Sequence, residues 1–238
     1  MNNLRRFNTY ADYSAATLNY PAVSWVVSGD TVYFDKAAPV IFGGLTVYYN
    51  IESQVIQNEI TLFNGGGDSS SSSDSGSGSG GGGALPATMI VDGVEETPIN
   101  TWRFETAGEH IVQYTFENNE IPYAFMNGIG LATKIEIGND ITTIPDENAD
   151  GRPFGNMPDL TSVTISNSIT YIGDSALNDC YSLESITVEA TYPPQLGSYS
   201  FENTNNCPIY VPASAVETYK GSTSTGWYEY ASRIQAIQ

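Results

Sequence analysis

Residues 161–188 read TSVTISNSITYIGDSALNDCYSLESITV, and this stretch decides the fold. Val163 and Ile165 alternate with small polar residues, and a second apolar pair, Ile169 and Ile172, follows shortly after them. Alternation of this kind is typical of a half-buried strand. Because so short a unit cannot close a hydrophobic core alone, it needs neighbours of the same kind stacked against it.

The same pattern recurs along the C-terminal half of the chain. A small residue or Pro, followed by a large apolar residue, stands at Ala124-Phe125, Pro153-Phe154, Ala176-Leu177 and Ser200-Phe201. The second members are 29, 23 and 24 residues apart, and the first interval is longer because residues 146–151 add six. A period of this length indicates leucine-rich repeats that stack into a solenoid. We therefore expect a mainly β solenoid of about four units, with short helices, over residues 120–238.

One unit departs from the pattern, and the stack needs a cap. Leu131 precedes Ile135 by four residues, where the corresponding spacing in the later units is three, so we expect irregular geometry there. At the C-terminal end, residues 208–238 contain a short strand, a short helix and then Trp227, Tyr230 and Ile234. We expect these apolar side chains to cover the last unit, because an open repeat end would expose the core to water.

Residues 43–119 predict a different β structure. Leu45, Val47 and Tyr49 fall on one face of a strand, and residues 109–116 alternate in the same way. The strands pooled from this region suffice for one small, Ig-like β-sandwich, which we expect to cover the N-terminal end of the solenoid. Within it, residues 65–83 contain only Gly, Ser and two Asp. We favour a loop insertion for this tract, and an inter-domain linker stays the alternative.

Residues 1–42 predict an attachment or oligomerisation segment. A short helix is expected within residues 9–20, followed by a hairpin of residues 24–27 and 31–34 around Ser-Gly-Asp. Two arginines near the start are not followed by an apolar run, so we do not expect a signal peptide. No run in the chain has the length and apolarity of a membrane-spanning helix.

The charge balance limits the partners. The chain carries 27 acidic and 8 basic residues, for a formal net charge of −19. Such a chain repels phosphate backbones and anionic lipid headgroups, so we expect neither nucleic acid nor a membrane surface as a partner.

The repeat and cap sequences resemble a known family. Residues 161–188 and the cap sequence YVPASAVETYK, residues 210–220, resemble the BspA-like leucine-rich repeats of Bacteroidales and their phages. VDGV, residues 91–94, and FETAGEH, residues 104–110, resemble the small β-domain that often precedes these repeats. The resemblance covers residues 85–238 and implies a protein that presents a surface. It also places Cys180 at a frequent core position, which favours buried free thiols at Cys180 and Cys207 over a disulfide.

The N-terminal segment resembles a second group. RRFNTYADY, residues 5–13, together with VYFDK, residues 32–36, is similar to leader segments of virion proteins from Bacteroides-infecting tailed phages, crAss-like phages among them. This resemblance implies a head fibre, decoration or tail-associated protein located in the virion. It implies contacts with other virion proteins through residues 1–42 and, by analogy with fibres, a homotrimer. A bacterial cell-surface BspA-like adhesin is the alternative.

The sequence offers little for catalysis. His110 is the single histidine and stands in Gly-Glu-His ahead of a strand, where we expect a turn or strand-edge role. We therefore expect no enzyme activity and no catalytic residues. Asp146, Asn148 and Asp150 have the spacing of a calcium loop, but position twelve is Met157 in place of Glu. A solvated loop is the favoured interpretation, and calcium at these three residues is the alternative; no other cofactor is expected.

Three tyrosines are candidate binding residues. Tyr171, Tyr181 and Tyr192 lie in the repeats and could contact a host surface protein or glycan. A purely structural role in the turns is the simpler interpretation for each.

Overall fold

The computed structural model describes residues 25–28, 31–34, 43–56, 58–64 and 85–238. The chain forms two compact units, Met1–Phe42 and Gly43–Gln238. In the first unit, β1 (Trp25–Ser28) and β2 (Thr31–Phe34) form the expected antiparallel hairpin, with Val27 opposite Val32. The helix expected within residues 9–20 lies outside the described residues.

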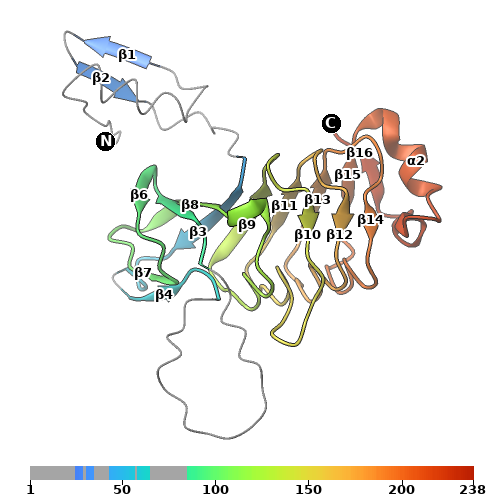
Figure 1. Cartoon of the computed structure of the whole chain (residues 1–238), viewed down its shortest axis with the longest axis horizontal. Coiled ribbons are helices and arrows are strands. Elements are labelled where there is room, and N and C mark those ends of the chain that lie inside the picture. The colour runs from blue at the N-terminus through green and yellow to red at the C-terminus, as the bar shows by residue number, and fades with distance from the viewer. Residues whose placement is uncertain (1–24, 29–30, 35–42, 57, 65–84) are drawn as a thin grey trace, which may run out of the picture. The chain divides into compact units, whose positions relative to one another are not determined.

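The second unit is built on a nine-stranded sheet with the order β16-β15-β13-β11-β9-β3-β8-β5-β6 (Figure 1). Its parallel strands are β9 (Ala132–Ile137), β11 (Ser162–Ile165), β13 (Ser185–Val188), β15 (Ile209–Val211) and β16 (Ile234–Ala236). The first three of these are the strands that the repeat pattern predicts, and β15 is the short strand predicted at the start of the cap.

A second, smaller parallel sheet runs alongside the first. It contains β10 (Thr143–Ile144), β12 (Tyr171–Ile172) and β14 (Gln195–Leu196), one strand from each of three successive units. Between the sheets lie rows of equivalent apolar side chains, all nearly inaccessible: Met126, Phe154, Leu177 and Phe201 in one row, and Ile135, Val163, Ile186 and Ile209 in another. Each such side chain stabilises the fold by about 1.5–3 kcal/mol through its burial.

The tight stacking depends on a glycine in each later unit. Gly173 and Gly197 follow β12 and β14 directly. A side chain at Gly173 would collide with the backbone of Pro145, and one at Gly197 with the backbone of Asp174. A glycine at this position therefore lets consecutive units approach to backbone contact.

The structure of the region before the repeats differs from the separate β-sandwich that we expected there. β3 (Leu45–Ile51) pairs antiparallel with β8 (Gly108–Thr115) on one side and with β9 on the other, and β5 (Thr88–Val91) and β6 (Val94–Glu96) extend the sheet. The β-sandwich expected for residues 43–119 is therefore not an independent domain. Its apolar face continues the repeat core, since Leu45 lies opposite Ile137 and Val47 opposite Ile135.

A short second layer covers this part of the sheet. β4 (Ile60–Thr61) and β7 (Thr101–Trp102) form a two-stranded antiparallel sheet, and the nearby Leu62, Phe63 and Phe104 are buried in the common core. β3 and β4 precede the Gly/Ser tract of residues 65–83, and their partners β8 and β7 follow it. The tract thus connects strands of one unit.

The first repeat is irregular, as its spacing predicts. Tyr48 lies opposite Lys134, but the next residue, Tyr49, lies opposite Ala132, so Thr133 is an extra residue in β9. Leu131 has a left-handed backbone, with φ of 62°. The extra residue between Leu131 and Ile135 is therefore absorbed as a β-bulge.

The C-terminal cap forms from the predicted residues. After β15, η2 (Ala213–Ala215) and α2 (Val216–Lys220) turn the chain away from the sheet, and η3 (Trp227–Tyr230) brings it back to β16. Trp227 and Tyr219 are fully buried and meet edge to face at 4.7 Å. The last strand, β16, lies in a segment for which we predicted only covering side chains. The remaining helix is η1 (Glu117–Asn119), and no helix in the described residues is long and apolar enough to cross a membrane.

Candidate binding surfaces

The outer side of the nine-stranded sheet is here called the sheet face; its side chains are partly exposed on the repeat strands, whereas Thr46, Tyr48 and Ile90 on the N-terminal strands are buried. Side chains alternate along each strand, so the residues next to the buried ones point outward. The strand register places one outward row across the sheet, from β6 to β16: Glu95, Ile90, Gln113, Thr46, Glu136, Thr164, Thr187, Tyr210 and Gln235. The row continues beyond the repeats, but Thr46 and Ile90 in it are buried, so the exposed part lies mainly on the repeat strands.

Four hydroxyl groups stand at the centre of the repeat part of this face. Ser162 lies opposite Ser185, and Thr164 lies opposite Thr187, and all four side chains are partly exposed. None of these hydroxyls forms a hydrogen bond with any residue that the structure describes, whereas Thr161, at the start of the same segment, donates to the Thr133 carbonyl at 2.9 Å. This set of four residues, the hydroxyl patch, can therefore donate to and accept from a partner.

The hydroxyl patch is bordered by larger groups. Tyr48 donates its hydroxyl to Glu136 at 2.8 Å, and Lys134 lies 2.6 Å from the same carboxylate and 4.5 Å from the centre of the Tyr48 ring. Burial and the hydrogen bond to Glu136 raise the pKa of Tyr48 well above its usual range. These three side chains hold one another in place, and Tyr210 borders the patch on the opposite side. The patch is thus a low area between fixed, bulky neighbours.

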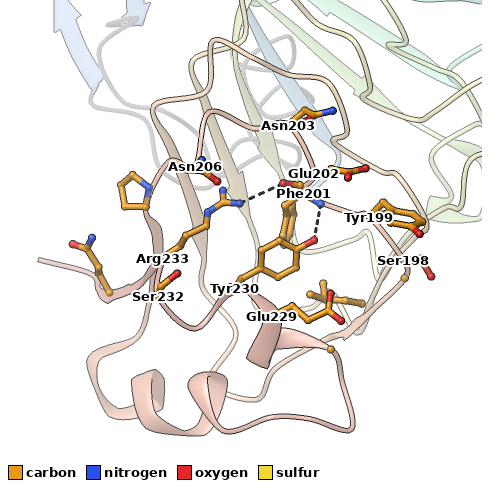
Figure 2. Close-up of a pocket in the computed structure, with 15 residues that line it drawn as sticks. Ser198, Tyr199, Phe201, Glu202, Asn203, Asn206, Glu229, Tyr230, Ser232 and Arg233 are labelled. Carbon is orange, nitrogen blue, oxygen red and sulfur yellow. Dashed lines mark hydrogen bonds between the residues drawn. The ribbon is translucent and has the colours of Figure 1, made fainter.

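A groove of about 950 Å³ lies between the last repeat and the cap, and we call it the cap groove (Figure 2). Tyr230 lies across its middle and packs edge to face on Phe201, with ring centres 5.4 Å apart. Arg233 donates to the carbonyls of Cys207 at 2.8 Å and Phe201 at 3.3 Å, and to the Thr204 hydroxyl at 2.9 Å. The arginine therefore ties the cap to the last turn of the repeats.

The three tyrosines selected from the sequence lie at different corners of the repeats. Tyr171, in β12, is partly buried, and its hydroxyl donates to Asp146 at 2.6 Å. That hydrogen bond and burial raise the pKa of Tyr171 to about 12. Tyr181 is 62% exposed and donates to Asp179, while Tyr192 is 84% exposed beside a shallow hollow formed with Pro193 and Pro194. The structure does not assemble the three into one site.

The calcium-loop candidates are occupied by internal contacts. One oxygen of Asp146 accepts both the Tyr171 hydroxyl and the backbone N–H of Asp174 at 2.8 Å. Asn148 accepts the backbone N–H of Asp150 at 2.9 Å, and Asn148 and Gly151 form a tight antiparallel bridge. Within the described residues, no three His, Cys, Asp or Glu side chains are grouped as a metal site requires. These contacts are those of a self-supporting turn.

The cysteines are buried in the core, and the histidine forms hydrogen bonds that hold neighbouring segments together. Cys180 and Cys207 are free and buried, and burial raises the pKa of Cys180 to about 11. The ring of His110 is buried against Phe104, with Nδ1 2.7 Å from the Asp92 carboxylate and Nε2 2.9 Å from the Thr106 carbonyl. His110 therefore links β8 to the β5–β6 turn and to the loop that precedes β8.

The sheet face and the cap groove were not predicted from the sequence. Tyr48 and Tyr210 could have been found from strand alternation, since each neighbours a buried core residue. Tyr199, which is 63% exposed at the cap groove, had no such signal, because the groove forms only when the cap folds onto the last repeat.

Comparison with known families supports the repeat assignment. Residues 119–224 match the family model described as BspA type leucine rich repeat region, in six copies. This part of the chain therefore carries BspA-type leucine-rich repeats. No curated protein matches the chain.

Proposed function

We propose that this protein is a non-enzymatic binding protein that presents its sheet face to a host surface protein or glycan. The observation that carries the proposal is the hydroxyl patch, four outward hydroxyls without hydrogen-bond partners in the described part of the chain. Leucine-rich repeats suggest surface and adhesion roles in general, and the match over residues 119–224 agrees with such a role.

We further propose that the protein is a structural component of a phage particle, as a head fibre, decoration or tail-associated subunit. The support is the N-terminal sequence, residues 5–13 and 32–36, which resembles virion leader segments. In this proposal residues 1–42 contact other virion proteins and the chain forms a homotrimer. The net charge of −19 would keep closely spaced copies soluble.

A bacterial cell-surface adhesin is the second candidate, and the repeat type itself favours it equally. Mass spectrometry of purified phage particles and of peptides released by protease from intact cells separates the two. We expect peptides of this chain in the particles. Their absence there, with recovery from the cell surface, would establish the second candidate instead.

The binding role is tested by blocking the hydroxyl patch. Thr187→Lys places a long charged side chain in the patch without touching the core, and Thr143→Lys is the matched control on the exposed side of β10. We expect fluorescently labelled Thr187→Lys protein to bind Bacteroidales cells about tenfold more weakly than the parent, equivalent to about 1.4 kcal/mol. The control should bind like the parent, and equal binding by both variants would exclude the sheet face as the contact.

A further inference from the structure

We propose that the cap groove binds a neutral oligosaccharide. Its volume of about 950 Å³ lies within the usual range of small-molecule sites, about 300–1,000 Å³. This inference goes beyond the proposed function, because it concerns a ligand of defined chemistry and a groove that shares only Gln235 with the outward row of the sheet face.

Tyr199 supplies the first argument. Its backbone is left-handed, with φ of 58°, a conformation that costs a bulky residue free energy. Of the three earlier units, two hold a small residue with the same backbone at the equivalent position, Ala124 and Ser175 with φ of 54° and 55°, and the other holds Arg152. The repeat geometry therefore accepts a small residue here, and the tyrosine ring, 63% exposed, adds no packing that the repeat needs.

An exposed aromatic ring at the edge of a groove suits a sugar. The ring offers a flat apolar surface to the C–H groups of a pyranose, while its hydroxyl stays in water. Tyr230 adds a second aromatic ring in the middle of the groove (Figure 2). The two tyrosines could contact neighbouring units of one saccharide chain.

Unused polar groups surround these rings. The side chains of Asn206, Ser232 and Gln235 make no hydrogen bond to any described residue, and each can both donate and accept. Sugar hydroxyls also donate and accept, so amide and hydroxyl groups match them in pairs. The groove thus combines apolar ring faces with free groups of the right polarity.

The charges of the groove select a neutral ligand. Glu202 and Glu229 are exposed in its lining, while the Arg233 guanidinium is turned toward backbone carbonyls and the Thr204 hydroxyl. An anionic sugar would meet two carboxylates and an arginine whose donors are already engaged. Sulfated or phosphorylated saccharides are therefore disfavoured.

The test uses the full chain and calorimetric titration with maltohexaose, cellohexaose, xylohexaose and mannohexaose. We expect at least one of these to bind, and Tyr199→Ser to weaken it by about tenfold or more. Tyr199→Ser should fold normally, because Ser175 adopts the same backbone conformation. Tyr123→Ser, at a tyrosine that is 54% exposed outside the groove, is the matched control and should bind like the parent.

Three outcomes would overturn the proposal. They are no binding of any of the four hexasaccharides at millimolar concentration, equal binding by the two tyrosine variants, and tighter binding of dextran sulfate than of dextran. Thr187→Lys separates the two surfaces, since it lies outside the groove: it should retain saccharide binding even where cell binding is lost.

Discussion

The two ends of the repeat stack are closed by different means. At the N-terminal end, β3 pairs with β9 over most of its length, so the main sheet continues into strands outside the repeats. At the C-terminal end, β16 adds three residues to the main sheet, while the cap covers the edge of the second sheet. There Leu196 donates its N–H to the Thr225 carbonyl at 3.0 Å, and the Trp227 indole N–H donates to Pro194 at 2.7 Å.

The two ends therefore have different roles: the N-terminal strands extend the main sheet, whereas the C-terminal cap covers the apolar core. Extending the sheet leaves the outer face of the repeat strands β11 and β13 partly exposed, although Thr46, Tyr48 and Ile90 on the N-terminal strands are buried. Closing the second sheet needs large side chains in a small space, and Trp227, Tyr219 and Phe201 provide them. We therefore expect the C-terminal closure to depend on fewer residues, each with a larger effect.

Removing the C-terminal closure should have the largest effect. A chain that ends at residue 212 lacks β16, Trp227 and Tyr219, so the last repeat and the edge strand β14 would face water. We expect this truncated chain to aggregate and to lose its cooperative thermal transition in calorimetry. A soluble truncated chain with a sharp transition would show that the cap is not needed for closure.

A single residue, Trp227, should contribute much of the stability of the C-terminal cap. Trp227 is fully buried and contacts the rings of Phe201 and Tyr219. We expect Trp227→Ala to lower the free energy of unfolding by about 3–5 kcal/mol, measured by urea denaturation. The neighbouring Tyr228, 49% exposed, gives the control Tyr228→Ala, for which a change below about 0.5 kcal/mol is expected. Similar losses of unfolding free energy in both variants would contradict the expectation that Trp227 contributes most to the stability of the cap.

The repeat itself could be predicted from sequence for a physical reason. Val163, Ile165 and Ile186 alternate because one face of each strand is buried, and the roughly constant period returns each to the same row. Trp227 and Tyr230 could be assigned to the cap because a stack of repeats must end, and no other large apolar cluster follows the last unit. In this region the local alternation of the sequence and the burial required by stacking predict the same core residues.

The N-terminal closure could not be predicted in the same way. The alternation of Leu45, Val47 and Tyr49 shows that they share a face, and all three are fully buried. Alternation does not identify the partner strand, and β9 lies some 80 residues further along the chain. The sheet face and the cap groove have the same origin in long-range pairing, which explains why exposed tyrosines alone gave an incomplete picture of the candidate sites.

Alkaline pH should lower the folding stability that buried tyrosines contribute at both ends of the stack. Burial raises the pKa of Tyr49 and Tyr114, at the N-terminal end, and of Tyr219, in the cap, well above the usual value near 10. Above pH 10 the unfolded chain loses these protons while the folded chain keeps them, so stability is complete below pH 10 and falls as the pH rises. At pH 11 each such tyrosine should lower the free energy of unfolding by about 1.4 kcal/mol. Urea midpoints at pH 8, 9, 10 and 11 measure this, and a constant midpoint would contradict it.

A matched pair of hydroxyl deletions compares the two ends directly. Tyr49 donates its hydroxyl to the Leu62 carbonyl, and Tyr219 donates to the Ala190 carbonyl, each buried and each at 2.7 Å. We expect Tyr49→Phe and Tyr219→Phe to lower the free energy of unfolding by about 1–2 kcal/mol each, because each leaves a buried carbonyl without this donor. Urea denaturation of the two variants measures both values. A much larger loss for one would show which end depends more on hydrogen bonding.

An ion pair close to solvent in the middle of the stack should have the smallest effect. Arg152 lies 2.6 Å from Asp179 and 3.0 Å from Glu147, and so fastens the six-residue insertion of residues 146–151 to the next unit. Hydrogen bonds from Asn203 and Tyr181, and then the contact with Arg152, lower the pKa of Asp179, while Arg152 is the largest cause of the lowered pKa of Glu147. Both carboxylates therefore contribute stability above their unfolded pKa values, near 4, that is lost as the pH falls.

We accordingly expect Arg152→Ala to lower the free energy of unfolding by less than about 1 kcal/mol at pH 7, since these groups are close to solvent. The difference between variant and parent should shrink as the pH falls from 5 to 3, because protonated carboxyl groups no longer attract the guanidinium. Urea denaturation at pH 7, 5 and 3 measures both effects. A loss comparable to that of Trp227→Ala would mean that this ion pair stabilises the stack as strongly as the buried cap residue does, and would contradict the expected small effect.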